Sequence, residues 1–490
     1  MSFAIPEGWQ AVIGLEVHVQ LNTATKIFCA CPTTFGAAAN TQVCPVCLGL
    51  PGALPVLNRE VVDKAILLGL ACGSAISERS VFARKNYFYP DLPKGYQITQ
   101  ADAPICVGGH IDVPAGDDGG AAVRLDLVRM HLEEDAGKSV HADAGRSLVD
   151  LNRAGVPLVE IVSEPGLTSP EQAAACLAEL RALVRTLGVS DGNLEQGSLR
   201  CDANISVRRL GDEHLGTRCE IKNLNSFRSV RDAAAHEIVR QITCLQAGEA
   251  IIQQTRLWDT EAGRTRAMRS KEDAHDYRYF PDPDLPELHV EPARVARLRA
   301  SLPELPAARR ARLHDVWGIP AHLAASLSAE PERAAAWEAA LGPSPTPERA
   351  VSFAHFLVGR VAGALNRSDR DSAEVLAAMP LIAEVHDRWR DGRLSNKMLA
   401  DLLSAAFDTS APLAISLRDA MDAAGTVVDD DDGLRRALDD ALAAHPAQAQ
   451  ALRSGETKLI GFFVGQVMQA LAGKADARRL TELLRAHVDS

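Results

Sequence analysis

The stretch Asp150-Leu-Asn-Arg-Ala-Gly-Val-Pro-Leu-Val-Glu-Ile-Val-Ser-Glu-Pro165 predicts how the first half of this chain folds. Its central run, Pro157 to Val162, is almost wholly apolar, which is typical of a strand buried on both faces of a sheet. Glu160 lies in the middle of that run. Because burial of an unpartnered carboxylate costs much free energy, Glu160 should meet a cation, a metal or strong hydrogen-bond donors. A purely structural buried ion pair is the alternative interpretation.

Four further predicted strands carry acidic residues. They are Ile13 to Leu21 with Glu16 and His18, Ala121 to Leu132 followed by Glu133, Glu134 and Asp135, Arg200 to Arg208 with Asp202, and Thr217 to Ile221 with Glu220 and then Lys222. If these strands share a sheet with Pro157 to Val162, their polar side chains converge on one face. A cluster of carboxylates with one imidazole suits a hard divalent cation and phosphate chemistry. Solvated strand faces are the alternative, since antiparallel sheets often keep one face in water.

A segment dense in cations and aromatic rings follows the first helix, Arg84-Lys-Asn-Tyr-Phe-Tyr-Pro-Asp-Leu-Pro-Lys-Gly-Tyr-Gln97. Its two prolines and its glycine predict a loop rather than a regular element. Such a loop suits a nucleotide or an RNA end, with Lys85, Tyr87 and Lys94 as candidate contacts. An ordinary packed loop is the alternative. The arginine-rich segment from Arg256 to Phe280 is a further candidate for a phosphate-binding surface, with a solvated mixed face as its alternative.

Four of the 10 cysteines form two close pairs, Cys29-Ala-Cys31 and Cys44-Pro-Val-Cys47. In a reducing compartment, clustered cysteines favour metal binding over disulfides. Four thiolates suit tetrahedral zinc, and because all four ligand positions are filled, the site would be structural rather than catalytic. Free thiols are the alternative. Five other cysteines are interpreted as buried thiols, namely Cys72, Cys176, Cys201, Cys219 and Cys244.

Length and composition indicate a globular chain of about three domains. Of its 490 residues, 47% are hydrophobic, so sizeable cores can form. No apolar run of about 18 residues is present and the N-terminal segment lacks the features of a signal peptide, so we expect a cytoplasmic protein with no membrane contact. The formal net charge of −12 argues against generic, charge-driven nucleic-acid binding, although a local basic patch can still hold RNA. Predicted helix N-caps are Asn58, Ser169 and Ser226.

From about residue 291 onward, alanine, leucine and charged residues recur at helical spacing. This pattern predicts a helical bundle to about Phe407 and then a smaller helical unit that ends in a helix from Ala477 to Val488. The predicted domains are therefore 1–292, 293–408 and 409–490. The sequence has no Walker A, protein-kinase, Rossmann or GxSxG motif. The residues alone therefore predict metal-dependent chemistry, of a phosphate type, in the first domain and a binding or docking role for the rest.

Several of these segments resemble the GatB family, the B subunits of the bacterial three-subunit glutamyl/aspartyl-tRNA amidotransferases, over almost the whole chain. The segments are Gly14 to Leu21, Arg84 to Gln100, His131 to Lys138, Asp150 to Pro165, Glu220 to Ser226, Asp276 to Pro286, Phe462 to Met468 and Gly473 to Asp476. Asp150 to Pro165 is the most specific of them. The resemblance implies an α+β fold, in which a cradle-like domain with a mainly antiparallel sheet flanked by helices precedes an all-helical middle domain and a small helical tail domain.

The resemblance also implies a reaction. ATP would phosphorylate the side-chain carboxylate of Glu-tRNA(Gln), Asp-tRNA(Asn) or both, and ammonia would then displace phosphate to leave the amide. Magnesium would bridge the phosphate and carboxylate oxygens, which repel each other. By resemblance His18, Glu134 and Glu160 hold this magnesium, with Glu133 in place of Glu134 if the strand register differs by one residue. Further candidates are Glu16, Asp202 and Glu220 for a second cation, Glu16 as a catalytic residue, and Lys222 at a phosphate.

In the family, ammonia comes from glutamine that the A component (GatA) hydrolyses. The implied partners are therefore GatA and GatC in a heterotrimer, together with the misacylated tRNA. The tail domain would grip the tRNA body, with candidate phosphate contacts at Lys458, Lys474, Arg478 and Arg479. Two other functions compete with this one. A non-catalytic zinc scaffold that binds RNA leaves Glu160 unexplained. A metal-dependent hydrolase working alone predicts turnover without ATP and without a partner.

Overall fold

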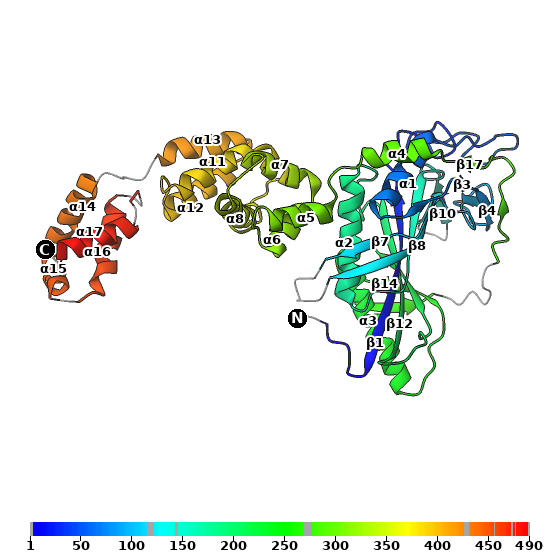
Figure 1. The fold of residues 1–490 in the computed structure, drawn as a ribbon, viewed down its shortest axis with the longest axis horizontal. Coiled ribbons are helices and arrows are strands. Elements are labelled where there is room, and N and C mark those ends of the chain that lie inside the picture. The colour runs from blue at the N-terminus through cyan, green and yellow to red at the C-terminus, as the bar shows by residue number, and fades with distance from the viewer. Residues whose placement is uncertain are drawn as a thin grey trace. The chain divides into compact units, whose positions relative to one another are not determined.

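The structure is a computed structural model that describes residues 3–114, 122–142, 146–268, 276–425, 431–454, 456–471, 474–475 and 477–488. The chain divides into two compact units, Met1–Arg309 and Arg310–Ser490. Figure 1 shows a sheet with long helices in the first unit and helices throughout the second. None of the described helices has both the length and the apolar composition needed to cross a membrane.

The first unit is built on one large, mainly antiparallel sheet. Its strands, together with four that form two separate two-stranded sheets, are β1 (Trp9–Gln20), β2 (Ala75–Ile76), β3 (Arg79–Ser80), β4 (Ala83–Asn86), β5 (Tyr96–Thr99), β6 (Cys106–Val107), β7 (His110–Val113), β8 (Val123–Glu134), β9 (Lys138–Ala142), β10 (Arg146–Asp150), β11 (Pro157–Ser163), β12 (Leu199–Arg209), β13 (Cys219–Leu224), β14 (Thr255–Asp259), β15 (Arg264–Ala267), β16 (Phe280–Pro281) and β17 (Leu288–His289). The main path of the sheet runs β15-β14-β13-β12-β1-β11-β8-β5-β4-β16. Its neighbours pair antiparallel except for β13 with β14.

Four helices accompany this sheet. They are α1 (Arg59–Ala71), α2 (Pro170–Thr186), α3 (Phe227–Gln246) and α4 (Pro292–Ala300). The strand β1 alternates as predicted, because Leu15, Val17 and Val19 are buried whereas Glu16 and His18 are half-buried. The apolar side of β1 shares one hydrophobic core with residues of α1, α2 and α3. The polar side of β1, which carries Glu16 and His18, lies outside that core.

The helix starts follow local sequence signals. The side chain of Asn58 accepts a hydrogen bond from the backbone N–H of Glu60, and Ser169 and Ser226 cap α2 and α3 in the same way. These three predicted N-caps are confirmed. Each cap satisfies a backbone donor that the first helical turn leaves without an intrahelical partner.

The prediction that Arg84 to Gln97 forms a loop throughout is wrong at both ends. β4 and β5 pair with each other, so only the middle of the segment connects strands as a loop. β5 also pairs with β8 through Thr99 and Glu133. The two ends of the segment are therefore recruited to the sheet by tertiary pairing, whereas the prolines and the glycine remain in the loop between them.

The second unit is helical. Its elements, beginning with a helix that crosses the unit boundary, are α5 (Pro306–Asp315), α6 (Ala321–Ser328), α7 (Pro331–Leu341), α8 (Pro347–His355), the π-helix η2 (Phe356–Val361), α9 (Ala362–Leu365), α10 (Ser372–Ala377), α11 (Met379–Arg390), α12 (Asn396–Phe407), α13 (Leu413–Ala424), α14 (Asp431–Ala444), α15 (Pro446–Arg453), α16 (Leu459–Ala470) and α17 (Ala477–Val488). Its buried residues form one core between Leu313 and Met421 and another between Leu434 and Leu484. The predicted fold class, a mainly antiparallel sheet with helices followed by an all-helical region, is confirmed.

Candidate active site

Adjacent strands carry the polar residues onto one face of the sheet. β1 lies between β11 and β12, and β11 lies between β1 and β8. Across these strands Glu16 is paired with Asp202, and Glu160 is paired with His18 on one side and with His131 on the other. Directly opposed residues of antiparallel strands project to the same face at about 5 Å between their Cβ atoms. The order of the strands therefore determines which acids meet.

Glu160 lies between two imidazoles. Its Oε2 is 3.5 Å from Nε2 of His18 and 3.2 Å from Nε2 of His131. Glu133 completes the group, because its two carboxylate oxygens lie 3.5 Å from Nε2 of His18 and 4.0 Å from Nε2 of His131. The exposed fractions of His131, Glu133 and Glu160 are only 4%, 3% and 8%. We call His18, His131, Glu133 and Glu160 the His/Glu cluster.

The donor atoms of this region fit a divalent cation. Glu16, His18 and Glu160 offer one ligand atom each within 4.8 Å of one another, and His131, Glu133 and Glu160 do the same. Carboxylate oxygens and imidazole nitrogens are ordinary ligands of divalent metals. Glu160 belongs to both sets, so it is the central carboxylate of the region.

The electrostatics of the His/Glu cluster favour positive charge beside Glu160. Burial lowers the pKa of His18, but its hydrogen bond with Glu160 and the charge of Glu133 outweigh burial and raise the pKa to about 9. Burial raises the pKa of Glu133, and the charge of Glu160 adds to the increase although His18 opposes it. The pKa of Glu160 is lowered in spite of burial, because His131 and His18 donate hydrogen bonds to its carboxylate.

A lysine neutralises the second group of predicted acids. Nζ of Lys222 donates to Oδ2 of Asp202 at 2.7 Å and lies 2.9 Å from Oε1 of Glu220. Burial lowers the pKa of Lys222, but the charges of the two carboxylates raise it overall. An ammonium group thus lies between Asp202 and Glu220, the two residues suggested for a second cation. Glu16 is not in this pair, and burial together with the charge of Glu160 raises its pKa.

A lysine and a group of tyrosines lie together on the β4 side of the site. Nζ of Lys85 is 4.9 Å from the ring centroid of Tyr277. Tyr277 meets Tyr87 and Tyr279 edge to face, at centroid distances of 6.3 and 6.1 Å. Burial lowers the pKa of Lys85, but the charges of Glu133 and Glu160, among others, raise it overall. Lys85 and Tyr87 are therefore neighbours of each other and lie within electrostatic reach of the His/Glu cluster.

Glu134 and Lys94 lie together, but not at the His/Glu cluster. Glu134 follows Glu133 in β8 and points to the opposite face, where its carboxylate pairs with Lys94 and accepts a hydrogen bond from the backbone N–H of Ile98 at 2.8 Å. Gly49 has a φ of +68° and packs so tightly that a Cβ there would lie 2.5 Å from Cγ of Lys94. Glu134 and Lys94 line a cavity of about 250 Å³ with residues of the cysteine-rich loops. Of the two candidate glutamates, the structure therefore places Glu133 beside His18 and Glu160.

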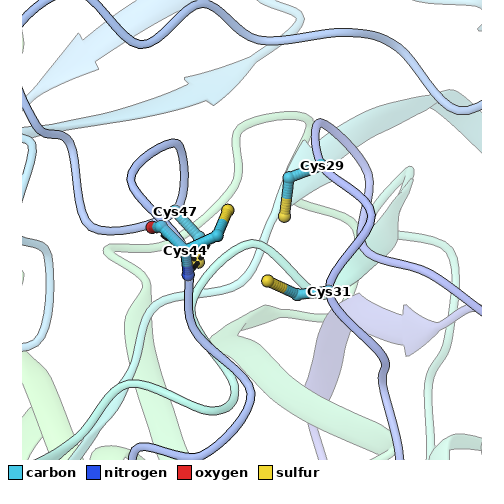
Figure 2. Close-up of side chains that lie close together, drawn as sticks. All are labelled: Cys29, Cys31, Cys44 and Cys47. Carbon is cyan, nitrogen blue, oxygen red and sulfur yellow. Dashed lines mark hydrogen bonds between the residues drawn. The ribbon is translucent and has the colours of Figure 1, made fainter.

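The four clustered cysteines converge from two loops. Figure 2 shows the side chains of Cys29 and Cys31 pointing toward the loop that carries Cys44 and Cys47. The four Sγ atoms all lie within 4.8 Å of one another. A hydrogen bond from the Cys29 thiol lowers the pKa of Cys47 to about 4, against burial, with help from the backbone N–H of Cys44 and the charge of Lys26. Four convergent sulfur ligands, one of them already disposed to ionise, fit a tetrahedral structural zinc ion.

Comparisons with known proteins place the chain in a family. The GatB/GatE catalytic domain matches residues 11–296, and the GatB domain matches residues 346–488, which together cover most of the 490 residues. The chain belongs to the GatB family. The first match spans every residue of the His/Glu cluster and all four clustered cysteines. The second spans the helices of the C-terminal half from α8 onward.

Close GatB relatives share one name, which describes them as the B subunit of aspartyl/glutamyl-tRNA(Asn/Gln) amidotransferase. The relative from Halorhodospira halophila is 48% identical over 98% of this chain and 99% of its own length. The relative from Geotalea daltonii is 50% identical over 97% of this chain and 98% of its own. A relative from a Janthinobacterium species is 48% identical over 97% and 99%. The chain is therefore similar to these amidotransferase components from end to end.

The candidate tRNA contacts of this GatB chain differ in their surroundings. Lys458 is exposed and Lys474 is half-buried. Arg479 is engaged locally, because it pairs with Asp431 at 2.6 Å and with Glu482 at 3.0 Å. The side chain of Arg478 lies outside what the structure describes.

The arginine-rich segment of this GatB chain is only partly a free surface. Arg256 points inward, donates to Oγ1 of Thr265 at 2.9 Å and lies 3.5 Å from Glu237. Arg266 pairs with Asp259 at 2.5 Å. Residues 269–275, which include Arg269 and Lys271, lie outside the described part of the chain. Of the arginines of β14 and β15, Arg256 is thus engaged within the protein, whereas Arg264 and Arg266 are exposed.

Sequence reasoning missed two side chains of the site, His131 and Tyr277. His131 and Glu133 are two residues apart on one strand, and that period-two spacing could have put both on the face of Glu160. Tyr277 has no such signal, because its contact with Lys85 joins segments that lie far apart in the sequence.

Proposed function

We propose that this GatB chain carries the kinase and amidation steps that convert Glu-tRNA(Gln), Asp-tRNA(Asn) or both into Gln-tRNA(Gln) and Asn-tRNA(Asn). The observation that carries the proposal is the position of Glu160. It is a buried carboxylate held between His18 and His131, beside Glu133, on the polar face of the sheet. The names of the relatives supply the substrate and the overall reaction.

The first step needs two anions to meet. A side-chain carboxylate oxygen of the aminoacyl group attacks the γ-phosphorus of ATP, the bond to the bridging oxygen breaks, and ADP leaves. The product is an acyl phosphate. Magnesium, when bound, neutralises the phosphate oxygens and aligns them with the attacking carboxylate. We assign its ligands to His18, Glu133 and Glu160, with Glu133 in the role that the family resemblance gave to Glu134.

Lys85 and Tyr87 are the proposed nucleotide contacts. Lys85 can neutralise a phosphate oxygen, and the rings of Tyr87 and Tyr277 offer faces and edges for a base or a sugar. Lys94 is the less suitable of the original candidates, because it is paired with Glu134 on the other face of the sheet.

The second step forms the amide. The lone pair of ammonia attacks the acyl carbon, the bond to the phosphate oxygen breaks, phosphate leaves and the nitrogen loses one proton. Glu16 is the proposed acceptor of that proton, because its pKa is raised and it lies beside Glu160. Lys222 is proposed to orient the departing phosphate. Its ammonium group, rather than a second metal, balances the charge of Asp202 and Glu220.

The four clustered cysteines are proposed to hold a structural zinc ion. Zinc, when bound, would cross-link the two loops and would take no part in the reaction. The ligands would be Cys29, Cys31, Cys44 and Cys47.

The assembly that we propose is a heterotrimer with GatA and GatC, in which GatA provides ammonia from glutamine. Residues 1–292 would form the catalytic cradle, 293–408 a helical linker and 409–490 a tail that grips tRNA. Lys458, Lys474, Arg478 and Arg479 are the proposed contacts with the tRNA backbone. Removal of any one of these lysines or arginines should weaken tRNA binding and reduce the salt dependence of the binding affinity.

The proposal is tested with the reconstituted heterotrimer, Glu-tRNA(Gln), ATP, and ammonium chloride in place of glutamine. We expect one ADP and one phosphate for each amide formed. Lys85→Met should raise the KM for ATP at least 10-fold and leave the KM for tRNA unchanged. Lys138→Met, at an exposed residue of β9, is the matched control. Amide formation without ATP would instead support a different chemistry, and no amide with either nitrogen source would support a scaffold.

A further inference from the structure

Lys26 is a lysine with no access to solvent. Its exposed fraction is 0%, and it is among the largest fully buried side chains of the described part of the chain. Its Nζ donates to the carbonyl oxygen of Gln42 at 2.8 Å and lies 3.4 Å from that of Leu151. Lys26 thus joins the segment before Cys44 to the start of the stretch from Asp150 to Pro165.

This ammonium group has no carboxylate partner. Among the residues that the structure describes, no Asp or Glu oxygen lies within 4.0 Å of the Lys26 Nζ. The two carbonyl groups supply dipoles but no net negative charge. Because an isolated ammonium is very costly to bury, Lys26 needs an anionic neighbour of another kind.

The thiols of the clustered cysteines are the candidates, since the Glu134 carboxylate, which also lies near Gly155, is already paired with Lys94. The backbone N–H of Lys26 donates to the carbonyl oxygen of Cys31 at 2.9 Å. The side chain packs against Gly155 together with Cys47, since a Cβ on Gly155 would lie 3.5 Å from Cδ of Lys26 and 3.6 Å from Cβ of Cys47. Gly155 has a φ of +82°, which favours glycine at this point of the chain. The aliphatic stem of Lys26 therefore runs directly beside the cysteine loops.

We propose that Lys26 is the internal counter-ion of the four-cysteine metal centre. Four thiolates around Zn²⁺ carry a net charge of −2, and one buried ammonium reduces that charge to −1 without admitting water. The same ammonium ties the Cys44 loop to Leu151, so the centre is joined to the stretch that leads into β11. Lys26 is a positioning residue, since it acts on the ligands and not on the metal itself. The inference rests on the zinc part of the proposed function and is independent of the ATP chemistry.

A counter-ion role predicts unequal effects in the two metal states. With zinc, loss of the ammonium leaves a dianionic centre buried, so zinc should be held less tightly. Without zinc, the loops are no longer held around a dianionic centre, so loss of the ammonium should cost the metal-free chain less stability than it costs the zinc-bound chain. A residue that only fills space would destabilise both states equally and leave the zinc affinity unchanged.

The test compares the full-length wild type with Lys26→Met and Lys26→Gln. Lys397→Met, at an exposed lysine of α12, is the matched control. Zinc content is measured first, and the zinc affinity is then measured by competition with a chromophoric chelator. The denaturant midpoint of each variant is measured with zinc and after chelation. We expect one zinc in the wild type, an affinity at least 10-fold weaker in both Lys26 variants, and a smaller loss of stability in the metal-free form than in the zinc-bound form.

Lys26→Gln separates charge from hydrogen bonding and serves if Lys26→Met fails to fold. A glutamine can still donate to the Gln42 carbonyl, but it carries no charge. Wild-type zinc affinity in Lys26→Gln, or equal destabilisation of both metal states, would overturn the counter-ion role. A wild-type chain that binds no zinc would overturn the metal centre as well, and it would leave the ATP-dependent reaction to be judged by its own assay.

Discussion

Glu133 and Glu134 are neighbours in β8, yet their carboxylates lie on opposite faces of the sheet. Glu133 lies 3.5 Å from His18 in the His/Glu cluster, whereas Glu134 pairs with Lys94 beside the cysteine-rich loops. Both are almost fully buried. β8 thus presents one carboxylate on each side of the sheet. Substitution of Glu133 should therefore affect activity, whereas substitution of Glu134 should affect stability.

Glu133→Gln should lower tRNA-dependent ATP cleavage by about 100-fold or more, because it removes a charge from the centre of the site. Glu134→Gln should instead lower the free energy of unfolding by about 3 kcal/mol, because it leaves Lys94 buried without its partner. The measurements are steady-state ATP cleavage by the complete assembly and denaturant unfolding of each variant. Loss of cleavage in Glu134→Gln with wild-type stability would show that the assignment of the two faces is wrong.

His131 should orient the Glu160 carboxylate for cation binding. Its Nε2 is 3.2 Å from Glu160, and its Nδ1 has no hydrogen-bond partner in the described part of the chain. Changing a group that orients a ligand typically weakens metal affinity 10- to 100-fold. We expect this loss for Mn²⁺ binding to His131→Gln, followed by electron paramagnetic resonance. His110→Gln on β7 is the control, and equal affinities in the two variants would count against a role for His131.

The stability of the first unit should depend on the ionisation of Glu237. This carboxylate is fully buried and accepts hydrogen bonds from Gln241 at 2.9 Å and Thr265 at 3.1 Å, beside Arg240 and Arg256. Although burial raises its pKa, hydrogen bonds from Arg240 and Gln241 lower it overall. A folded-state pKa below the unfolded value gives stability that is present above the unfolded pKa and is lost as the pH falls through the folded pKa.

Glu237→Gln should therefore cost about 2 kcal/mol of unfolding free energy at pH 7, the usual range for hydrogen bonds to a charged group. The difference from the wild type should shrink as the pH falls below about 4, the ordinary range of a glutamate. Urea unfolding at a series of pH values measures it. A difference that stays constant down to pH 3 would assign the effect to packing rather than to charge.

Zinc removal should expose four thiols and no more. Cys72, Cys106, Cys176, Cys201 and Cys219 are buried away from the cluster and should resist alkylation in the folded chain. Cys244 is half-buried and should react whether or not zinc is present. Mass spectrometry after alkylation should therefore show four additional modified cysteines on chelation, and these should map to the two pairs from Cys29 to Cys47. An unchanged pattern would mean that the cluster holds no metal.

Much of the fold follows from signals that act within one element. The alternation of β1 and the caps at Asn58 and Ser226 depend on neighbours in sequence, and these features were predicted correctly. The strands β4 and β5 were not, because β4 pairs with β5 and β16, and β5 pairs with β8, all at long range in the sequence or across the loop. Local propensity does not encode such long-range pairing.

The candidate site likewise has features that depend on one element and features that depend on long-range pairing. That Glu160 needs a partner follows from one buried run, but which glutamate meets it depends on the register of β8 against β11, and one residue of register exchanges the two faces. The pairing of Lys222 with Asp202 depends on the register of β12 and β13, whereas Glu220 lies two residues from Lys222 on the same strand. The packing of Lys26 beside the cysteines depends on a turn at Gly155, more than a hundred residues away.

The most direct test of the central claim follows ATP cleavage by the complete assembly with and without Glu-tRNA(Gln). The wild type is compared with Glu160→Gln and with Glu164→Gln, a matched change at an exposed glutamate of the same stretch. We predict cleavage that requires the charged tRNA, that falls at least 100-fold in Glu160→Gln and that persists in Glu164→Gln. Cleavage that survives in Glu160→Gln would contradict the account and leave Glu160 with a structural role alone.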